Sequence, residues 1–148
     1  MIIVPSTKYQ WDTLARFLEL RAGVQPSADL RMIAWITDDD VKMVVGLDGF
    51  IGKVCRIHVG MVPEFKFTPK AMLEAVFEFT FGNGADAANR DMVIGIVNSK
   101  NSKAMRYDLH LGFKEAHRFI GVHDDGGDMV LLTMSKQDCK YIQQERAA

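Results

Sequence analysis

The segment from Met92 to Phe113, MVIGIVNSKNSKAMRYDLHLGF, predicts a strand, a turn, a helix and the start of a second strand. Met92–Val97 is a nearly unbroken apolar run with β-branched residues, which is typical of a strand covered on both faces. Polar residues interrupt the run, and Asn101 or Ser102 can cap the following helix with a side-chain oxygen. Residues spaced three and four apart share one face of that helix: Ala104, Tyr107 and Leu111. Gly112 ends the helix, because glycine readily takes the left-handed conformation needed there.

The same string resembles the acetyl-CoA-binding half of the GNAT N-acetyltransferase superfamily. The family's pattern is an Asn, two intervening residues and an Ala, followed after several more residues by Gly-Phe. Here the pattern is present as Asn101-Ser102-Lys103-Ala104, then residues 105–111, then Gly112-Phe113.

The rest of the chain supplies further elements in the order that this family has. Apolar patterns and turn residues predict strands at residues 1–5, 32–36, 41–47, 51–61, 113–122 and 129–134, and helices from Ser6 or Thr7 to Gly23 and from Thr68 to Gly82. Residues 24–30 are expected to be a loop or a second short helix, and the polar tail from Gln137 a helix. The order β, α, β-β-β, α, β, α, β-β predicts a GNAT-like, mixed α/β (α+β) fold. Its central sheet would be mostly antiparallel, with helices on both faces.

Several local features sharpen this prediction. Asp38–Asp40 is expected to be a solvated hairpin turn, and Asp48-Gly49 is a second turn signal. The strand at 51–61 alternates, with the apolar set Cys55, Ile57, Val59 and Met61 facing the core. Thr68 can cap the next helix with Pro69 at its first position, where a missing amide costs least. The predicted apolar face of that helix consists of Ala71, Met72, Ala75, Val76 and Phe79.

Length and composition favour one soluble domain, residues 1–148. A formal net charge of −1 gives no reason to expect nucleic-acid binding, and no apolar run approaches the length of a membrane span. Met1–Pro5 lacks the features of a signal peptide. The two cysteines, Cys55 and Cys139, have no metal-like spacing, so free thiols in a cytoplasmic protein are expected, with no metal site.

The resemblance also implies acetyl-CoA as co-substrate, lying where the fourth and fifth strands splay apart. Its pyrophosphate would sit on backbone amides at the start of the helix after the fourth strand, because those amides are unpaired donors. The residues implied for binding are Val59, Met61, Lys66, Thr68, Lys70, Ala71, Asn101 and Ala104. Pro69 stands where the family has its central Gly, and proline has no amide to donate.

Catalytic residues are suggested by position and chemistry. Many family members carry a Tyr four residues before the Gly of Gly-Phe, and its hydroxyl protonates the departing thiolate. Here that position is Asp108, which would face the thiol, while Tyr107 is turned about 100° around the helix toward the core or a neighbouring helix. His58 and Glu64 are the candidate general bases that would take a proton from the amine.

Three functions remain open at this point. The first is an N-acetyltransferase that moves an acetyl group from acetyl-CoA to an unidentified amine by direct attack. The second is a catalytically silent GNAT-fold module for binding or structure, which Pro69 and Asp108 both favour. The third is a regulatory acyl-CoA binder. A homodimer would be unsurprising for this family.

Overall fold

The computed structural model describes residues 1–65 and 67–142. Its elements follow the predicted order: β1 (Ile2–Ile3), α1 (Lys8–Ala22), β2 (Arg31–Thr37), β3 (Asp40–Ile51), β4 (Val54–Met61), α2 (Lys70–Phe81), β5 (Met92–Asn98), α3 (Ser102–Leu111), β6 (Lys114–Phe119), β7 (Met129–Ser135) and the 3-10 helix Lys136–Asp138. The predicted mixed α/β fold is confirmed.

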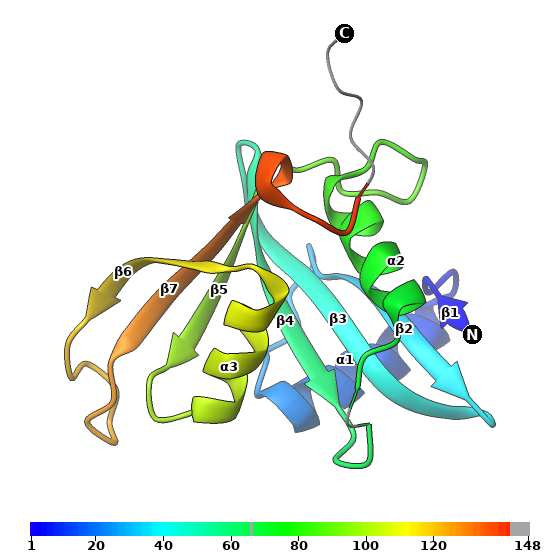
Figure 1. Cartoon of the computed structure of the whole chain (residues 1–148). Helices are drawn as coiled ribbons and strands as arrows, with labels where there is room; N and C mark the ends of the chain where they lie inside the picture. The colour runs from blue at the N-terminus through cyan, green and yellow to red at the C-terminus, as the bar shows by residue number, and fades with distance from the viewer. Residues whose placement is uncertain (66, 143–148) are drawn as a thin grey trace, which may run out of the picture.

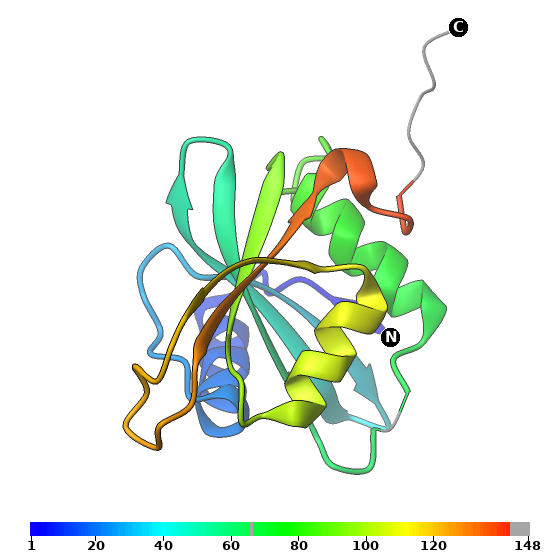
Figure 2. The ribbon, with the colours of Figure 1, turned by 60° about the vertical axis from the view of Figure 1, so that its left-hand side comes forward.

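The strands form one seven-stranded sheet in the order β1-β2-β3-β4-β5-β7-β6. Every neighbouring pair is antiparallel except β4 and β5, which are parallel. Helices α2 and α3 cover one face of the sheet and α1 covers the other, as Figure 1 and the turned view in Figure 2 show. The mostly antiparallel sheet with helices on both faces therefore agrees with the prediction.

The core has two parts, one on each face of the sheet. The larger lies under α2 and α3 and includes Phe77, Phe81, Val93 and Leu132. The smaller lies under α1 and is made by eight buried residues: Leu14, Ala15, Leu18, Val24, Leu30, Met32, Ala34 and Val44. Residues 24–30 form a loop rather than a helix, and the Trp11 indole Nε1 donates to the Leu30 carbonyl oxygen at 3.0 Å. This contact fixes the loop against α1.

Side-chain caps and left-handed glycines define two of the helices. The Thr7 hydroxyl accepts from the Gln10 amide at the start of α1, and Gly23 ends α1 with φ 68°. The Asn101 side chain accepts from the Ala104 amide at the start of α3, and Gly112 ends it with φ 110°. Of the residues proposed as caps, Thr7 and Asn101 are thus the ones that act.

The predicted turn at Asp48-Gly49 is wrong. β3 continues through these residues to Ile51, and the chain reverses at Gly52 and Lys53, so Ile51 belongs to β3 and not to the next strand. Asp48 lies opposite Arg56 of β4, and the register shifts between Asp48 and Ile51. The left-handed Gly49, with φ 60°, is absorbed in this irregularity instead of making a turn.

The start of α2 also differs from its prediction. Pro69 is the N-cap residue, no side chain caps the helix, and the Thr68 hydroxyl shares a hydrogen bond with Tyr107 instead. Ala71 is exposed rather than buried, while Phe77 and Phe81 complete the buried face. Within the first turn of α2, Lys70 and Ala71 are thus exposed while Met72 is fully buried.

Two smaller predictions are wrong as well. β5 is fully covered on one face only, since the Ile96 side chain on its other face is 47% exposed. Residues 137–142 contain no α-helix, and only the short 3-10 turn at Lys136–Asp138 is found there. The rest of the predicted tail helix, residues 143–148, lies outside the described residues.

Candidate active site

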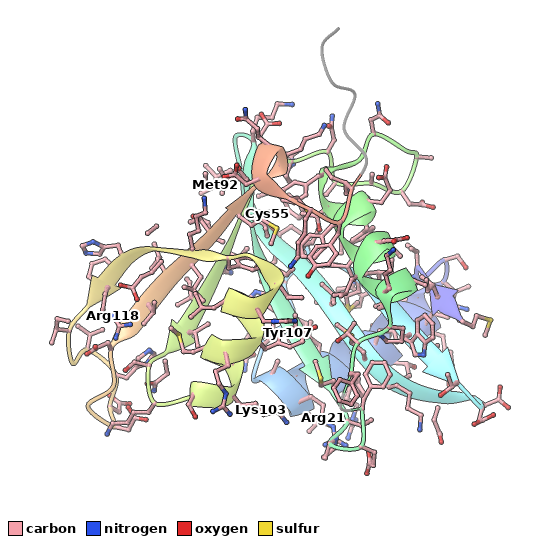
Figure 3. The ribbon with its side chains drawn as sticks, viewed as in Figure 1. Arg21, Cys55, Met92, Lys103, Tyr107 and Arg118 are labelled. Atoms are coloured by element: carbon pink, nitrogen blue, oxygen red, sulfur yellow. The ribbon has the colours of Figure 1, made fainter. Side chains whose placement is uncertain are left out.

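The parallel strands β4 and β5 pair over a short distance and then separate. Their partners are Val54 with Met92, Cys55 with Val93 and Arg56 with Ile94. Figure 3 shows Cys55 and Met92 at the paired end, and Arg21 and Lys103 at the opposite end of the molecule with Tyr107 between. The splay predicted between the fourth and fifth strands is therefore present.

A cavity of about 580 Å³ lies along this splay, a size suited to a small-molecule ligand. β4, β5, α3 and the end of α1 contribute its walls. Seven residues proposed from the sequence line it: His58, Val59, Met61, Asn101, Ala104, Tyr107 and Asp108. Arg21, Lys103 and Gly95 line it too, and sequence reasoning did not single them out. The topology thus gathers most of the proposed residues at one place.

Asp108 of α3 points into the cavity next to Gly95. A Cβ atom at Gly95 would lie 3.7 Å from Asp108 Oδ2, so glycine leaves room in front of the carboxyl group. Burial raises the pKa of Asp108 from 3.8 to about 6. A carboxyl group with that pKa can hold or release a proton near neutral pH.

Tyr107 occupies the neighbouring position on α3 and is held in place by a partner from the loop before α2. Its hydroxyl lies 2.9 Å from the Thr68 hydroxyl oxygen. Burial, the main effect, raises the pKa of Tyr107 above its usual value, so it stays a phenol. Tyr107 also packs against the main core, as its position on the helix predicted.

His58 of β4 lies against a carboxylate that sequence reasoning missed. Asp48 of β3 is only 2% exposed, and its Oδ1 accepts from His58 Nε2 at 2.8 Å and from Arg56 Nε at 3.1 Å. Because a carboxylate only accepts, Nε2 carries a proton, and in the neutral imidazole the lone pair is therefore on Nδ1. The buried acid therefore fixes both the orientation and the tautomer of His58.

Asp48 could have been found by its register. An acid and a base on adjacent antiparallel strands become neighbours once the reversal is placed at Gly52 and Lys53. The Asp-Gly pair at 48–49 is instead a strong local turn signal, and it concealed this relation.

The other proposed residues that the structure describes do not line the cavity. Glu64, Lys70 and Ala71 are exposed, and Thr68 reaches the cavity wall only through Tyr107. Lys66 lies outside the described residues. The amides of Lys70 and Ala71 have no hydrogen-bond acceptor among the described residues, so the start of α2 keeps donors for an anion.

The described residues contain neither a cluster of metal ligands nor a membrane-spanning helix. No three residues from among His, Cys, Asp and Glu are grouped there as a metal site would require. Within the same part of the chain, every helix falls short of the length and apolar character of a membrane span.

No protein-family model matches the sequence, and no curated protein matches it in sequence. Solved structures do match the fold. One is a chimera of spermidine N-acetyltransferase SpeG from Vibrio cholerae and hSSAT, with a TM-score of 0.72 and 11% identity over 95% of this chain and 98% of that one.

Two further structures extend this likeness. Spermidine N-acetyltransferase from Vibrio cholerae in complex with CoA and spermine has a TM-score of 0.68 and 10% identity, over 93% of this chain and 96% of its own. A GNAT-family acetyltransferase from Bacillus anthracis has a TM-score of 0.59 and 13% identity, over 74% and 68%. The protein therefore has the fold of the GNAT acetyltransferases, as its sequence pattern predicted.

Proposed function

We propose that the protein is an N-acetyltransferase that moves an acetyl group from acetyl-CoA to an amine by direct attack. The observation that carries this proposal is the cavity at the splay, which is lined by both Asp108 and His58, with Asp48 hydrogen-bonded to His58 behind the cavity wall. In this reading the amine nitrogen attacks the thioester carbonyl carbon, the carbon–sulfur bond breaks, and an amide and a thiol form.

Acetyl-CoA would be the second substrate, and the residues present fit it in part. The free amides of Lys70 and Ala71 suit a pyrophosphate, and the Lys70 side chain is 87% exposed beside them. Pro69 removes one donor but presets the backbone with φ −58°. Asn101, Ala104, Val59 and Met61 would contact the arm that leads to the thioester.

His58 would act as the general base. Only a neutral amine is nucleophilic, so an ammonium must first lose a proton. His58 Nδ1 has the free lone pair, and Asp48 stabilises the imidazolium that forms when the proton arrives. Glu64 is the weaker candidate because it is exposed on the loop outside the cavity.

Asp108 would supply the proton that the departing thiolate needs. Its position is the one predicted to face the thiol, and its raised pKa of about 6 keeps a fraction of it protonated near neutrality. Backbone amides left unpaired by the separation of β4 and β5 could polarise the thioester carbonyl group. Tyr107 is less suited to this proton transfer because its hydroxyl is engaged with Thr68.

A catalytically silent module is the alternative, and Pro69 favours it. Its ring stands where an amide and open space would otherwise receive a phosphate. Without phosphate binding the cavity would serve another ligand or none. Cys55 and Cys139 are buried free thiols, which supports a cytoplasmic location in either case. A homodimer stays a prediction.

Thermal unfolding with acetyl-CoA, CoA or ATP separates these functions. A ligand that binds the folded state raises the unfolding temperature by mass action. We expect saturable shifts with acetyl-CoA and CoA but not with ATP, followed by acetyl-CoA-dependent thiol release with some amine of a broad panel. His58→Gln should keep the shift and lose the turnover. Absence of any shift at millimolar ligand would contradict the transferase and favour the silent module.

A further inference from the structure

The charges that line the cavity are mostly positive. Among the described residues, its cations are Arg21 and Lys103 and its one acid is Asp108. His58 and Tyr107 are the other ionisable side chains that line it. Neither Arg21 nor Lys103 forms an ion pair within the described part of the chain. The Arg21 guanidinium carbon lies 5.8 Å from the centroid of the Phe17 ring. The cavity therefore has two cationic side chains that are available to bind an anionic group of a ligand.

Arg21 lies on the same face of β4 as His58. It belongs to the last turn of α1, and a Cβ atom at Gly60 would lie 3.0 Å from the Arg21 Cβ. Gly60 thus allows the end of α1 to lie close to β4. Side chains alternate along a strand, so His58 and Gly60 share the α1 face, and they lie about 7 Å apart along it. An arginine side chain spans that distance.

Among the described residues that line the cavity, the α1 face of β4 presents no acid to a polycation. Asp48 is the buried carboxylate there, but its Oδ1 is already engaged by both Arg56 and His58. A polyamine has several ammonium groups that need carboxylates, whereas this wall presents a guanidinium group. The acceptors in the names of the similar structures are thus poorly matched to this chain.

We propose that the acceptor is an amine that also carries a carboxylate, as an amino acid does, and that Arg21 binds this carboxylate. This inference rests on the proposed acetyl transfer. The amino group would lie at His58 and the carboxylate at the planar fork of Arg21, which suits two parallel hydrogen bonds. Arg21 is then a specificity-determining residue.

The phosphates of CoA are the other anions that Arg21 could meet. Their proposed site is the start of α2, on the opposite face of the sheet from α1, where Figures 1 and 2 show α2 and α3. We therefore assign Arg21 to the acceptor, and the experiment includes an arm for each anion.

The test compares matched acceptors with the full chain. Initial rates of thiol release are measured with amino acids, their methyl esters and spermidine, for the wild type, Arg21→Gln and Arg21→Lys. Arg16→Gln is the control, because it removes the same charge from an exposed position of α1 that does not line the cavity. We expect the wild type and Arg16→Gln to prefer acids over esters by about 10-fold or more in kcat/KM. Arg21→Gln should reduce that ratio to about one with acetyl-CoA binding unchanged, and Arg21→Lys should retain part of it.

Each other result has a defined meaning. Equal or better rates with esters or spermidine would overturn the acceptor class while leaving the transferase intact. A weakened acetyl-CoA thermal shift in Arg21→Gln, with an unchanged acid-to-ester ratio, would assign Arg21 to the CoA phosphates and overturn the inference. Lack of turnover with every amine would overturn the proposed function itself, and the inference with it.

Discussion

Helices α2 and α3 lie on the same face of the sheet, yet they begin in opposite ways. The first turn of α3 is closed, because the Asn101 side chain accepts from the Ala104 amide at 3.1 Å. The first turn of α2 is open, because Pro69 has no side chain that can accept and the Thr68 hydroxyl is turned to Tyr107. The Lys70 and Ala71 amides are thereby left without an acceptor in the described structure.

The two helices therefore offer a ligand different chemical groups. The first turn of α3 is capped by the Asn101 side chain, and the helix presents side chains along its length, among them the largely buried carboxyl group of Asp108. α2 presents its backbone end. The open amides belong to exposed residues, so water can complete their hydrogen bonds at little cost, whereas the carboxyl group of Asp108 loses solvation on burial.

The largest effect is expected from Asp108→Asn. This variant tests whether the buried carboxylate of α3 lowers the stability of the protein. The pKa of Asp108 is 3.8 ordinarily and about 6 in the folded protein. Between these pH values the folded state holds more protons than the unfolded state, so the free energy of unfolding falls as pH rises from about 4 to about 6. It stays at the lower value above that range. The uncharged variant should be more stable than the wild type at pH 7 by about 3 kcal/mol.

Denaturant unfolding at pH 4 and pH 7 measures this directly. The wild type should lose stability over that interval relative to Asp108→Asn. A variant less stable than the wild type at pH 7 would show that the carboxylate is well accommodated.

The next effect compares the two helix starts through added charge. Ala71→Glu places a carboxylate at the open end of α2, and Ser102→Glu places one at the closed end of α3. Each should raise the free energy of unfolding by about 0.5 kcal/mol, because a negative charge favours a helix N-terminus. Only Ala71→Glu should weaken acetyl-CoA binding, by about tenfold or more, through repulsion of the pyrophosphate. Calorimetric titration of both variants checks this, and equal affinities would place the phosphate elsewhere.

Removal of the cap itself gives a smaller effect. Asn101→Ala should lower the free energy of unfolding by about 1 kcal/mol, the usual cost of losing an N-cap. Asn101→Asp keeps an acceptor and should restore most of that loss, which separates the cap from other contacts. Loss from both variants would mean that the side-chain amide has a different role.

The smallest effect concerns the link between the two helices. Tyr107→Phe removes the hydroxyl that meets Thr68 and should cost about 1 kcal/mol or less, since one neutral hydrogen bond contributes that much. Thr68→Val should cost a similar amount, and the double variant should cost less than the sum if the two hydroxyl groups act on each other. Simple additivity would show that they do not.

Local patterns predicted most of the fold because they agree with the tertiary structure. Apolar spacing and the left-handed glycines Gly23 and Gly112 define elements whose order alone indicates the family fold. The prediction failed at Asp48, where a turn-forming Asp-Gly pair is overridden by hydrogen bonds from Arg56 and His58. Such bonds depend on the strand register, which local propensity does not encode.

The candidate site was predictable only in part. Helical spacing predicted that Asp108 faces the site, where it lines the cavity, and strand alternation places His58 opposite the core-facing set. Arg21 could not be assigned, because its proximity to the splay depends on how α1 crosses β4 at Gly60. That crossing is a property of packing between elements distant in sequence.

The separation of β4 and β5 has a consequence for how the protein meets other chains. A strand edge with unbonded amides and carbonyls invites pairing with another protein, and natural sheets usually cover or charge such edges. Beyond Arg56 and Ile94 this sheet has two of them, but they face each other inside the molecule. α1 and α3 flank the gap on opposite faces, as Figures 1 and 2 show, and both helices stand in the way of a strand that would pair there. A narrow ligand with amide groups of its own can enter the gap. The backbone hydrogen-bonding groups of β4 and β5 are thereby available to small molecules but shielded from pairing with the strands of other proteins.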